Sequence, residues 1–568
     1  MHMNKWVILN KKLNIENKKL RTEKIVNVLL SNRGLKTKKE IDNFLNPKLS
    51  DLTIDNAGID RKEIDKSVKR IKRAIEDKEQ IIVFGDYDVD GICGSAILWE
   101  ALNDAGAKVL PYIPHRVDEG YGLSEAGIKN IIVKHPDTSL IITVDNGIVA
   151  NKAVDIANKN NIDVIITDHH VPSAKLPRAF SIVHTTSLCG TGVAYMLSKQ
   201  LRTNNEKLIT GKEFDHLSLV AVATVADLVP LMGLNRVFLK FGLEELRKTK
   251  RQGLLALIKE SAIEQREINV FEIGHILAPR INAMGRLELA MDSLRLLCTK
   301  DEKKCEELAK KLGETNKRRK DITIESFEHA KEKIKSQPVR HAQGKNAKLK
   351  SLIFIGDQSY NPGVIGLMAS RLVEEFYRPS IVLSIGEKFS KASARSISGL
   401  NIIEFIRKAS DLLVDAGGHP MAAGFTIETS KIGLLRAKLI KLSKTHIPLS
   451  LLKRTIRIDT EILPEDISTD FYDEILKLSP FGIKNPQPVF LTKNLLVSDM
   501  RLVGFDKRHV SFKLISSENK PMDAIAFNLS EKANDIRIGD RIDVVYAIDK
   551  ETWRGVARFK LKLRDFKK

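Results

Sequence analysis

The feature that most restricts the fold is an alternation of apolar and helical segments between residues 65 and 185. Four short runs, QIIVFG, KVLPYI, SLIITV and DVIIT, are separated by stretches with helical spacing such as ICGSAILWEALNDAG and NKAVDIANKNN. The runs are apolar at successive positions, as in strands that are buried on both faces. Strands that alternate with helices in this way form parallel sheets. The segment therefore predicts an α/β domain built on a parallel sheet.

The rest of the 568-residue chain divides where the residue pattern changes. Residues 190–300 are mostly helical in pattern, and the charged stretch 300–336, interrupted only by Gly313, indicates a connecting helix followed by a loop. A second α/β unit begins near residue 351, and five or six short strands after residue 452 indicate a barrel of the OB type. We therefore predict a multidomain α/β protein, with a long helix between two α/β domains and a C-terminal all-β barrel.

The predicted domain limits follow these changes. They are 1–60 for a basic helical segment, 61–300 for the first α/β domain, 301–350 for the connecting helix and linker, 351–451 for the second α/β domain, and 452–568 for the barrel. Within the first segment we expect a pair of helices that ends near Pro47.

Charge and cysteine content restrict the partners. The formal net charge is +21. A basic surface gains affinity for polyanions by displacing counterions, which favours nucleic acid, although lysine-rich solvated helix faces are the alternative. The four cysteines form no C-x-x-C pair, which argues against a zinc ribbon or a redox motif. Because no run of eighteen apolar residues and no signal peptide is found, we expect a cytoplasmic protein without membrane contact.

Acidic and imidazole side chains follow three of the predicted strands, and another acid ends a long apolar helical run. They are Asp86, Asp88, Asp90, Asp145, Asp168, His169, His170 and Asp227. A single Asp after a strand is commonly a helix cap or turn residue. The carboxyl ends of parallel strands, however, meet at one sheet edge, where sites form. Carboxylates with a few imidazoles suit Mn²⁺ or Mg²⁺, and two cations would relieve the repulsion among the acids and assist displacement at phosphorus.

The motifs GDYDVDG, VDNG and TDHH, in this order and spacing, resemble those of the DHH phosphoesterase superfamily. The stretches GTGVAYML, ATVADLVPLMGLNR, APRINAMGRL, NPGVIGLMASRLVE, SARS and GGHPMAAGF are similar to those of its RecJ family. The resemblance covers nearly the whole chain. It implies a single-strand-specific 5′→3′ DNA exonuclease of DNA repair and recombination, in which a narrow cleft between the two α/β domains admits single strands and excludes duplex.

The resemblance also implies an active site with two ions of Mn²⁺ or Mg²⁺. The implied ligands are Asp86 and Asp88 for one ion, Asp90, His169 and Asp227 for the other, and Asp145 as the bridge. Asp145, His169 and His170 form the implied catalytic group, in which His170 faces the scissile phosphate. Asp168 would orient His169.

A second set of residues matches positions that the family uses near the terminal phosphate of the strand. They are Arg280, Asn282, Ser393, Arg395, Gly417, Gly418 and His419. Arginine suits this task because its guanidinium meets phosphate oxygens with two parallel bonds. The alternatives are an interdomain salt bridge for Arg280 and a core position for His419.

The terminal barrel resembles the OB-fold of the family, which is expected to follow a single strand. Candidate stacking aromatics are Phe505, Phe512, Phe527 and Trp553, although aromatics on barrel strands are more often core residues. The chain departs from the family in a shorter loop after TDHH, where His184-Thr185 replaces an Asn-Pro pair, and at Lys484, where glycine is usual. His184 is therefore an imidazole near the site without an assigned role.

Three functions are compatible with these patterns. An exonuclease on single-stranded DNA is favoured over a phosphodiesterase for short or cyclic oligonucleotides, because the basic arm and the barrel suit a long polymer. A non-catalytic scaffold or strand-binding protein is disfavoured because all the implied ligands are present. The expected form is a monomer, and a single-stranded-DNA-binding protein and a RecQ-type helicase are candidate partners.

Overall fold

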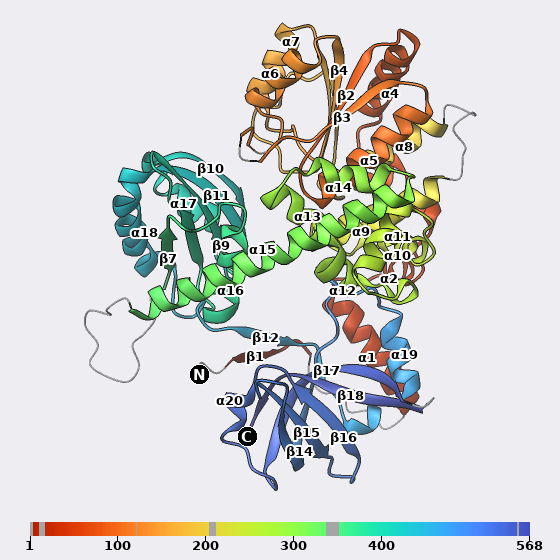
Figure 1. Cartoon of the computed structure of the whole chain (residues 1–568). Coiled ribbons are helices and arrows are strands. Elements are labelled where there is room, and N and C mark those ends of the chain that lie inside the picture. Colours follow the sequence, from red (N-terminus) through yellow and green to blue (C-terminus); the bar gives the residue numbers. More distant parts are fainter. Residues whose placement is uncertain are drawn as a thin grey trace. The chain divides into compact units, whose positions relative to one another are not determined.

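The structure is a computed structural model that describes residues 4–10, 18–116, 118–120, 122–203, 212–336, 351–553 and 556–568 (Figure 1). The chain forms two compact units. The first unit comprises Leu29–Asn316 and Asp470–Gln487, and the second comprises Met1–Val28, Lys317–Thr469 and Pro488–Lys568. The loop QPVRHAQGKNAK that was predicted after the connecting helix lies outside the described residues. Among the described residues, no helix is long and apolar enough to cross a membrane.

The first unit contains a parallel sheet of five strands in the order β3-β2-β4-β5-β6 (Figure 1). The strands are β2 (Gln80–Gly85), β3 (Lys108–Tyr112), β4 (Thr138–Val144), β5 (Asp163–Asp168) and β6 (Ser181–His184). One face packs against α4 (Arg61–Glu76), α5 (Val89–Asp104) and α8 (Gly190–Thr203), and the other against α6 (Glu125–Lys134) and α7 (Asn151–Lys159). The predicted parallel sheet is confirmed. Its short edge strand β6 was not predicted.

The region 190–300 is helical, as predicted, and packs around α5 in the largest apolar core of the first unit. Its helices after α8 are α9 (Lys212–Ala226), α10 (Gly233–Leu246), α11 (Gln252–Glu260), α12 (Val270–Glu272), α13 (Ala278–Leu287) and α14 (Met291–Cys298). The short helices of this unit outside that region are α2 (Lys38–Leu45), α3 (Ile54–Ala57) and most of α19 (Thr469–Leu476). The predicted connecting helix is α15 (Glu302–Ser336), which is continuous over 35 residues.

The second unit contains a mixed sheet in the order β10-β11-β9-β8-β7, in which only β7 and β8 are parallel. The strands are β7 (Ile353–Asp357), β8 (Ser380–Ser384), β9 (Phe389–Arg395), β10 (Leu413–His419) and β11 (Ala422–Glu428). The helices of this α/β part are α16 (Ile365–Phe376), α17 (Ile402–Arg407) and α18 (Ile432–His446). The second α/β unit expected from the sequence is therefore present.

The C-terminal barrel is a sheet of six strands in the order β13-β14-β15-β16-β18-β17, which a β14–β17 pairing closes. The strands are β13 (Thr460–Glu461), β14 (Phe490–Val503), β15 (His509–Ile515), β16 (Pro521–Ala526), β17 (Arg541–Trp553) and β18 (Val556–Lys567), with α20 (Ser530–Ala533) between two of them. The predicted all-β barrel is confirmed, although β14, β17 and β18 are longer than the short strands expected.

One predicted barrel strand lies outside the barrel sheet. β12 (Thr455–Ile458) pairs in parallel with the N-terminal strand β1 (Lys5–Ile8), in a register that joins Thr455 to Lys5. Only a short bridge, β13, continues from this segment into the barrel. The helix pair α1 (Lys18–Asn32) and α2 follows β1, as expected from the sequence. β1 was not predicted, because its partner strand lies about 450 residues away along the chain and no local pattern indicates the pairing.

The candidate stacking aromatics of the barrel differ in exposure. Phe512 is 1% exposed and packs against Phe566. Phe505 is 109% exposed at the turn between β14 and β15, and Phe527 is 52% exposed. The side chain of Trp553 lies outside the described residues. The core alternative therefore holds for Phe512, while Phe505 and Phe527 are exposed.

A buried ionic network fixes the end of α5 in the first unit. Glu100 accepts hydrogen bonds from Arg251 Nη1 at 2.6 Å and Nη2 at 3.0 Å and lies 2.8 Å from His216 Nε2. Arg251 also bonds Asp215 at 2.5 Å. Burial raises the pKa of Glu100, but the bonds from His216 and Arg251 outweigh it and lower the pKa to about 2. The network is a source of stability that depends on the charge of Glu100.

Acid should therefore weaken the first unit. The folded-state pKa of Glu100 is below its ordinary value of 4.5, so its contribution is present above about pH 4.5 and is lost as the pH falls toward 2. The shift corresponds to at most about 3 kcal/mol. Urea unfolding at pH 7 and pH 3.5 should show a smaller loss of stability for Glu100→Gln than for the unchanged chain. Equal losses in both proteins would show that Glu100 is not the responsible group.

Candidate metal centre and phosphate-binding residues

The loop after β2 places three aspartates at the carboxyl edge of the parallel sheet. Asp88 is the N-cap of α5, and its Oδ1 accepts hydrogen bonds from the amides of Asp90 at 3.0 Å and Gly91 at 3.1 Å. The loop is tight at Gly91, where an added Cβ would lie 2.4 Å from the carbonyl oxygen of Asp86. Asn282 of α13 braces the loop by accepting from the amide of Val89 at 3.1 Å. Asp88 thus has the capping role that a lone aspartate would have, in addition to its place beside the other acids.

Asp145 follows β4 in a left-handed backbone conformation with φ of 64°. Aspartate tolerates this region better than most residues, and strained conformations concentrate at functional sites. Gly190 at the start of α8 lies so close that an added Cβ would be 2.7 Å from Asp145 Oδ1. The backbone therefore holds this carboxylate at the sheet edge with very little free space around it.

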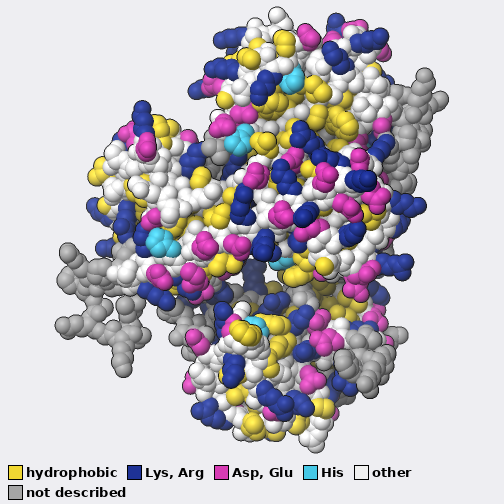
Figure 2. Space-filling view, in the orientation of Figure 1, with side chains coloured by type: hydrophobic (Ala, Val, Ile, Leu, Met, Phe, Trp, Pro, Cys, Tyr) yellow, Lys and Arg dark blue, Asp and Glu magenta, His cyan; other side chains and the backbone are white. Residues whose placement is uncertain are grey.

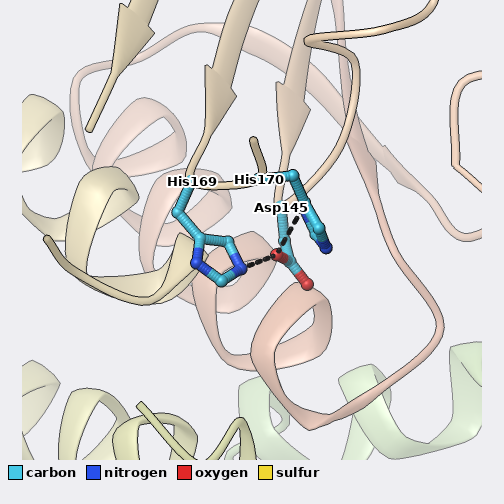
Figure 3. Close-up of side chains that lie close together, drawn as sticks. All are labelled: Asp145, His169 and His170. Atoms are coloured by element: carbon cyan, nitrogen blue, oxygen red, sulfur yellow. Dashed lines mark ion pairs between the residues drawn. The ribbon is translucent and has the colours of Figure 1, made fainter. Parts of the chain in front are cut away.

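The residues after β5 meet Asp145 (Figure 3). His169 Nε2 lies 3.1 Å and His170 Nδ1 lies 3.9 Å from Asp145 Oδ1. Asp168 Oδ1 lies 2.8 Å from His170 Nδ1 and accepts from the amides of His169 and His170 at 2.7 and 3.1 Å. Asp168 was expected to orient His169. It bonds His169 only at the backbone amide, and the ring that it bonds is that of His170.

The predicted ligands converge in three overlapping groups, in each of which the ligand atoms lie within 4.8 Å of one another. The groups are Asp86, Asp88 and Asp145; Asp90, His169 and Asp227; and Asp145, His169 and His170. His169 Nε2 lies 3.6 Å from Asp227 Oδ2 and 3.8 Å from Asp90 Oδ2. The loop after β2, the ends of β4 and β5, and the end of α9 thus contribute to one cluster.

The acids in this cluster are poorly solvated and repel one another. Burial, followed by the charge of a neighbouring aspartate, raises the pKa of Asp86, Asp88 and Asp145. The same two causes raise the pKa of Asp227 to about 9. Burial lowers the pKa of His169 and so favours its neutral form, which is the form that binds metals. Burial also opposes protonation of His170, but the bond to Asp168 outweighs it and raises the pKa.

Several buried atoms of the cluster lack a hydrogen-bond partner among the described residues. They are both carboxylate oxygens of Asp86, together with Oδ1 of Asp145 and Nε2 of His169, which lie 3.1 Å apart without a hydrogen bond between them. Buried polar atoms are normally satisfied, so such a set is typical of a site that binds a ligand or an ion. A set of five carboxylates with two imidazoles fits Mn²⁺ or Mg²⁺, and a positive ion would offset the repulsion among the acids. The residues present therefore fit a divalent metal centre.

Two residues that position Asp90 were not identified as such from the sequence. The amides of Gly190 and Thr191 donate to the two carboxylate oxygens of Asp90, each at 2.7 Å, and Thr191 Oγ1 donates to the carbonyl of Asp90 at 2.6 Å. They lie at the N-terminus of α8, where free backbone amides attract anions. The glycine-rich stretch GTG before a helical run is the signal that could have indicated this role.

The predicted phosphate-binding residues of the first unit have partners within that unit. Arg280 Nε donates to Glu260 at 2.6 Å, and its Nη1 donates to the carbonyl of Ile276 at 2.9 Å. Glu260 in turn packs against Gly313 of α15, where an added Cβ would lie 1.9 Å from Glu260 Oε1. Arg280 therefore forms a salt bridge, but its partner lies on α11 of the same unit and the bridge is not the interdomain one that was considered from the sequence.

The other predicted phosphate-binding residues gather on the mixed sheet of the second unit. The register aligns Arg395 with Ala422 and His419 across β9, β11 and β10, and aligns Ser393 with Gly424 and Gly417 two residues along. Residues two apart on a strand share a face, so these side chains lie on one side of the sheet. Arg395 Nη1 donates to Ser393 Oγ at 3.1 Å.

His419 is exposed and is not a core residue. Gly418 has φ of 139°, and an added Cβ there would lie 2.4 Å from the carbonyl oxygen of Ala422, so only glycine fits. A basic, glycine-rich face of this kind suits an anion.

Known families match the chain in three successive parts. The DHH family N-terminal domain matches residues 80–224, the DHHA1 domain matches residues 346–445, and the RecJ OB domain matches residues 458–565.

Relatives with an assigned function match nearly the whole chain. The single-stranded-DNA-specific exonuclease RecJ of Bacillus subtilis is 36% identical over 553 residues, which cover 95% of this chain and 67% of that protein. The protein of the same name from Escherichia coli is 30% identical over 524 residues, which cover 87% of this chain and 88% of that protein. The crystal structure of Thermus thermophilus RecJ with Mn²⁺ superposes with a TM-score of 0.81 at 26% identity, over 99% of this chain and 79% of the other. The Mg²⁺ complex of that protein superposes with a TM-score of 0.75 at 26% identity, over 99% of this chain and 78% of the other.

Proposed function

Because this chain belongs to the RecJ family of single-stranded-DNA-specific exonucleases, we propose that it is a metal-dependent exonuclease that degrades single-stranded DNA from the 5′ end. The observation that carries the proposal is the cluster of five aspartates and His169 at the sheet edge, several of whose buried atoms make no hydrogen bond. The members of this family and the barrel matched by the RecJ OB domain favour a DNA polymer as substrate over a cyclic or very short oligonucleotide. The proposed role is in DNA repair and recombination.

The proposed centre holds two divalent ions. Asp86 and Asp88 would hold one, while Asp90, His169 and Asp227 would hold the other. Asp145 is the proposed bridge, because it is the carboxylate that belongs to two of the three groups. Divalent ions in such a site neutralise charge at phosphorus and lower the pKa of water.

The chain's own groups would orient the phosphodiester. His170, whose Nδ1 lies 2.8 Å from Asp168 Oδ1, is the proposed donor to the scissile phosphate, and the bond favours its protonated form. Glu260 holds Arg280 in a fixed direction through Nε, as a group that binds phosphate must be held. Ser393, Arg395, Gly417, Gly418 and His419 are the proposed contacts of the 5′-terminal phosphate.

The barrel is the proposed binding surface for the rest of the strand. Exposed Phe505 and Phe527 offer faces on which bases can stack, and Lys507 and Arg508 in the same turn offer positive charge. An enzyme that needs free single strands depends on proteins that open duplex and cover the product. We therefore propose a RecQ-type helicase and a single-stranded-DNA-binding protein as partners of a cytoplasmic monomer.

The test uses an oligonucleotide labelled at either end, offered as single-stranded DNA, single-stranded RNA and blunt duplex DNA, with Mn²⁺, Mg²⁺ or EDTA. We expect 5′→3′ shortening of the single strand with either metal, none with EDTA, and cleavage of blunt duplex slower by at least about a hundredfold. Equal cleavage of duplex and single strand would contradict the proposed specificity. Shortening from the 3′ end would contradict the proposed polarity.

A further inference from the structure

His184 is the last residue of β6 and lies beside the candidate metal centre. In the parallel pairing of β5 with β6, it is aligned with Asp168, which precedes the two histidines of the site. Its side chain is partly buried. His184 therefore lies next to the end of β5, where the chain leaves the sheet through His169 and His170.

The side chain of His184 contacts the backbone of His170. His184 Nε2 lies 2.7 Å from the carbonyl oxygen of His170. Because a carbonyl oxygen only accepts, Nε2 must carry the hydrogen, which fixes the direction of this bond. His170 is thus held at two points: Asp168 bonds its ring and amide, and His184 bonds its carbonyl.

The carbonyl of His170 is the last anchored group before an exposed loop. Val171, the next residue, is 68% exposed, and Leu176 farther along is 49% exposed. The loop is next attached at Lys175, whose carbonyl accepts from Asn151 at 3.1 Å. Without the bond from His184, the peptide after His170 could rotate, and the ring position would depend on the contacts of the ring itself, which include the bond to Asp168.

We propose that His184 is a positioning residue, which fixes the His170 imidazole through the His170 main chain. The proposal rests on the proposed nuclease function, in which the ring of His170 contacts the phosphate. It assigns a role to the histidine that stands in this chain where the family usually has asparagine.

A double-mutant cycle tests whether His184 acts through His170. His184→Leu removes the donor, and we expect kcat on single-stranded DNA to fall about tenfold with little change in KM. His184→Gln keeps an N–H at a similar reach and should remain within about threefold of the unchanged chain. In a His170→Ala background, His184→Leu should have no further effect. The same fall in both backgrounds would overturn the proposal, because the two residues would then act independently.

The fold and the proposed function are tested separately. His446→Leu is the matched control, since the exposed His446 also lies near a backbone carbonyl, that of Leu442 at 3.1 Å, on α18 of the second unit. It should leave kcat unchanged. Amide hydrogen exchange in EDTA should be faster over residues 168–171 in His184→Leu but not in His184→Gln. If the unchanged chain cleaved no DNA, the proposed function would fail, and unchanged exchange in His184→Leu would reject the positioning role independently.

Discussion

Replacing Asp145 by asparagine should reduce metal-dependent cleavage by at least about a thousandfold, while it raises the melting temperature of the metal-free chain. Asparagine keeps the shape of the side chain and tolerates the left-handed backbone at φ of 64°. It removes the charge that belongs to two of the three ligand groups. Without metal, that charge is buried beside Asp90, Asp88 and Asp86, which is why burial and these neighbours raise its pKa. The charge of Asp145 should therefore destabilise the metal-free fold and bind the metal when ions are present.

The matched control for this prediction is Asp168→Asn. Burial raises the pKa of Asp168, but its bond with His170 lowers the pKa by more. The folded-state pKa is therefore below the ordinary value. Its charge therefore stabilises the metal-free fold at neutral pH, and the amide should lower the melting temperature. Thermal unfolding in EDTA at pH 8 measures both variants. A fall in melting temperature for Asp145→Asn, or cleavage near the unchanged rate, would contradict the role assigned to Asp145.

Arg236→Met should destabilise the first unit by about 3 to 5 kcal/mol. Arg236 is 1% exposed, and its guanidinium lies 3.7 Å from the ring centroid of Phe44. Its Nε donates to the carbonyl of Phe44 at 2.6 Å. Its Nη1 donates to the carbonyl of Leu478 at 3.0 Å, and its Nη2 donates to the carbonyl of Ser479 at 2.7 Å. One buried cation thus joins α2, α10 and the segment after α19. Methionine would fill much of the space but leave these carbonyls buried without a donor.

Arg247→Met provides the comparison at the end of the same helix. Arg247 is only half-buried, and its Nε donates to one carbonyl, that of Ile268, at 2.8 Å. Its loss should cost about 1 kcal/mol. Urea unfolding of the two variants at neutral pH measures the difference. Similar losses for both would show that the carbonyls around Arg236 find other partners or water.

The sequence was sufficient where the pattern is local. The continuous apolar runs of β2, β4 and β5 indicate a sheet covered on both faces, and parallel strands must bring their carboxyl ends to one edge. Asp86, Asp145 and His169 could therefore be placed together before any coordinates. The long charged stretch between residues 300 and 336 likewise predicts the helix α15.

Features that depend on distant partners could not be read in this way. The pairing of β1 with β12 joins segments about 450 residues apart along the chain, and neither strand shows it alone. The register of β15 decides that Phe512 is buried, while Phe505 is exposed because it lies in the turn after β14. The bond from His184 to the His170 carbonyl depends on the position of β6, a strand of four residues that carries no period of its own.

The central claim is that one site built from these acids holds two ions and that cleavage depends on both. The most direct measurement is a titration of the metal-free chain with Mn²⁺, in which bound ions per chain and cleavage of single-stranded DNA are followed together. We predict two bound ions, with cleavage appearing as the second site fills, and fewer than two ions with no cleavage for Asp145→Asn. Full cleavage with one ion bound, or cleavage that persists in EDTA, would contradict the claim.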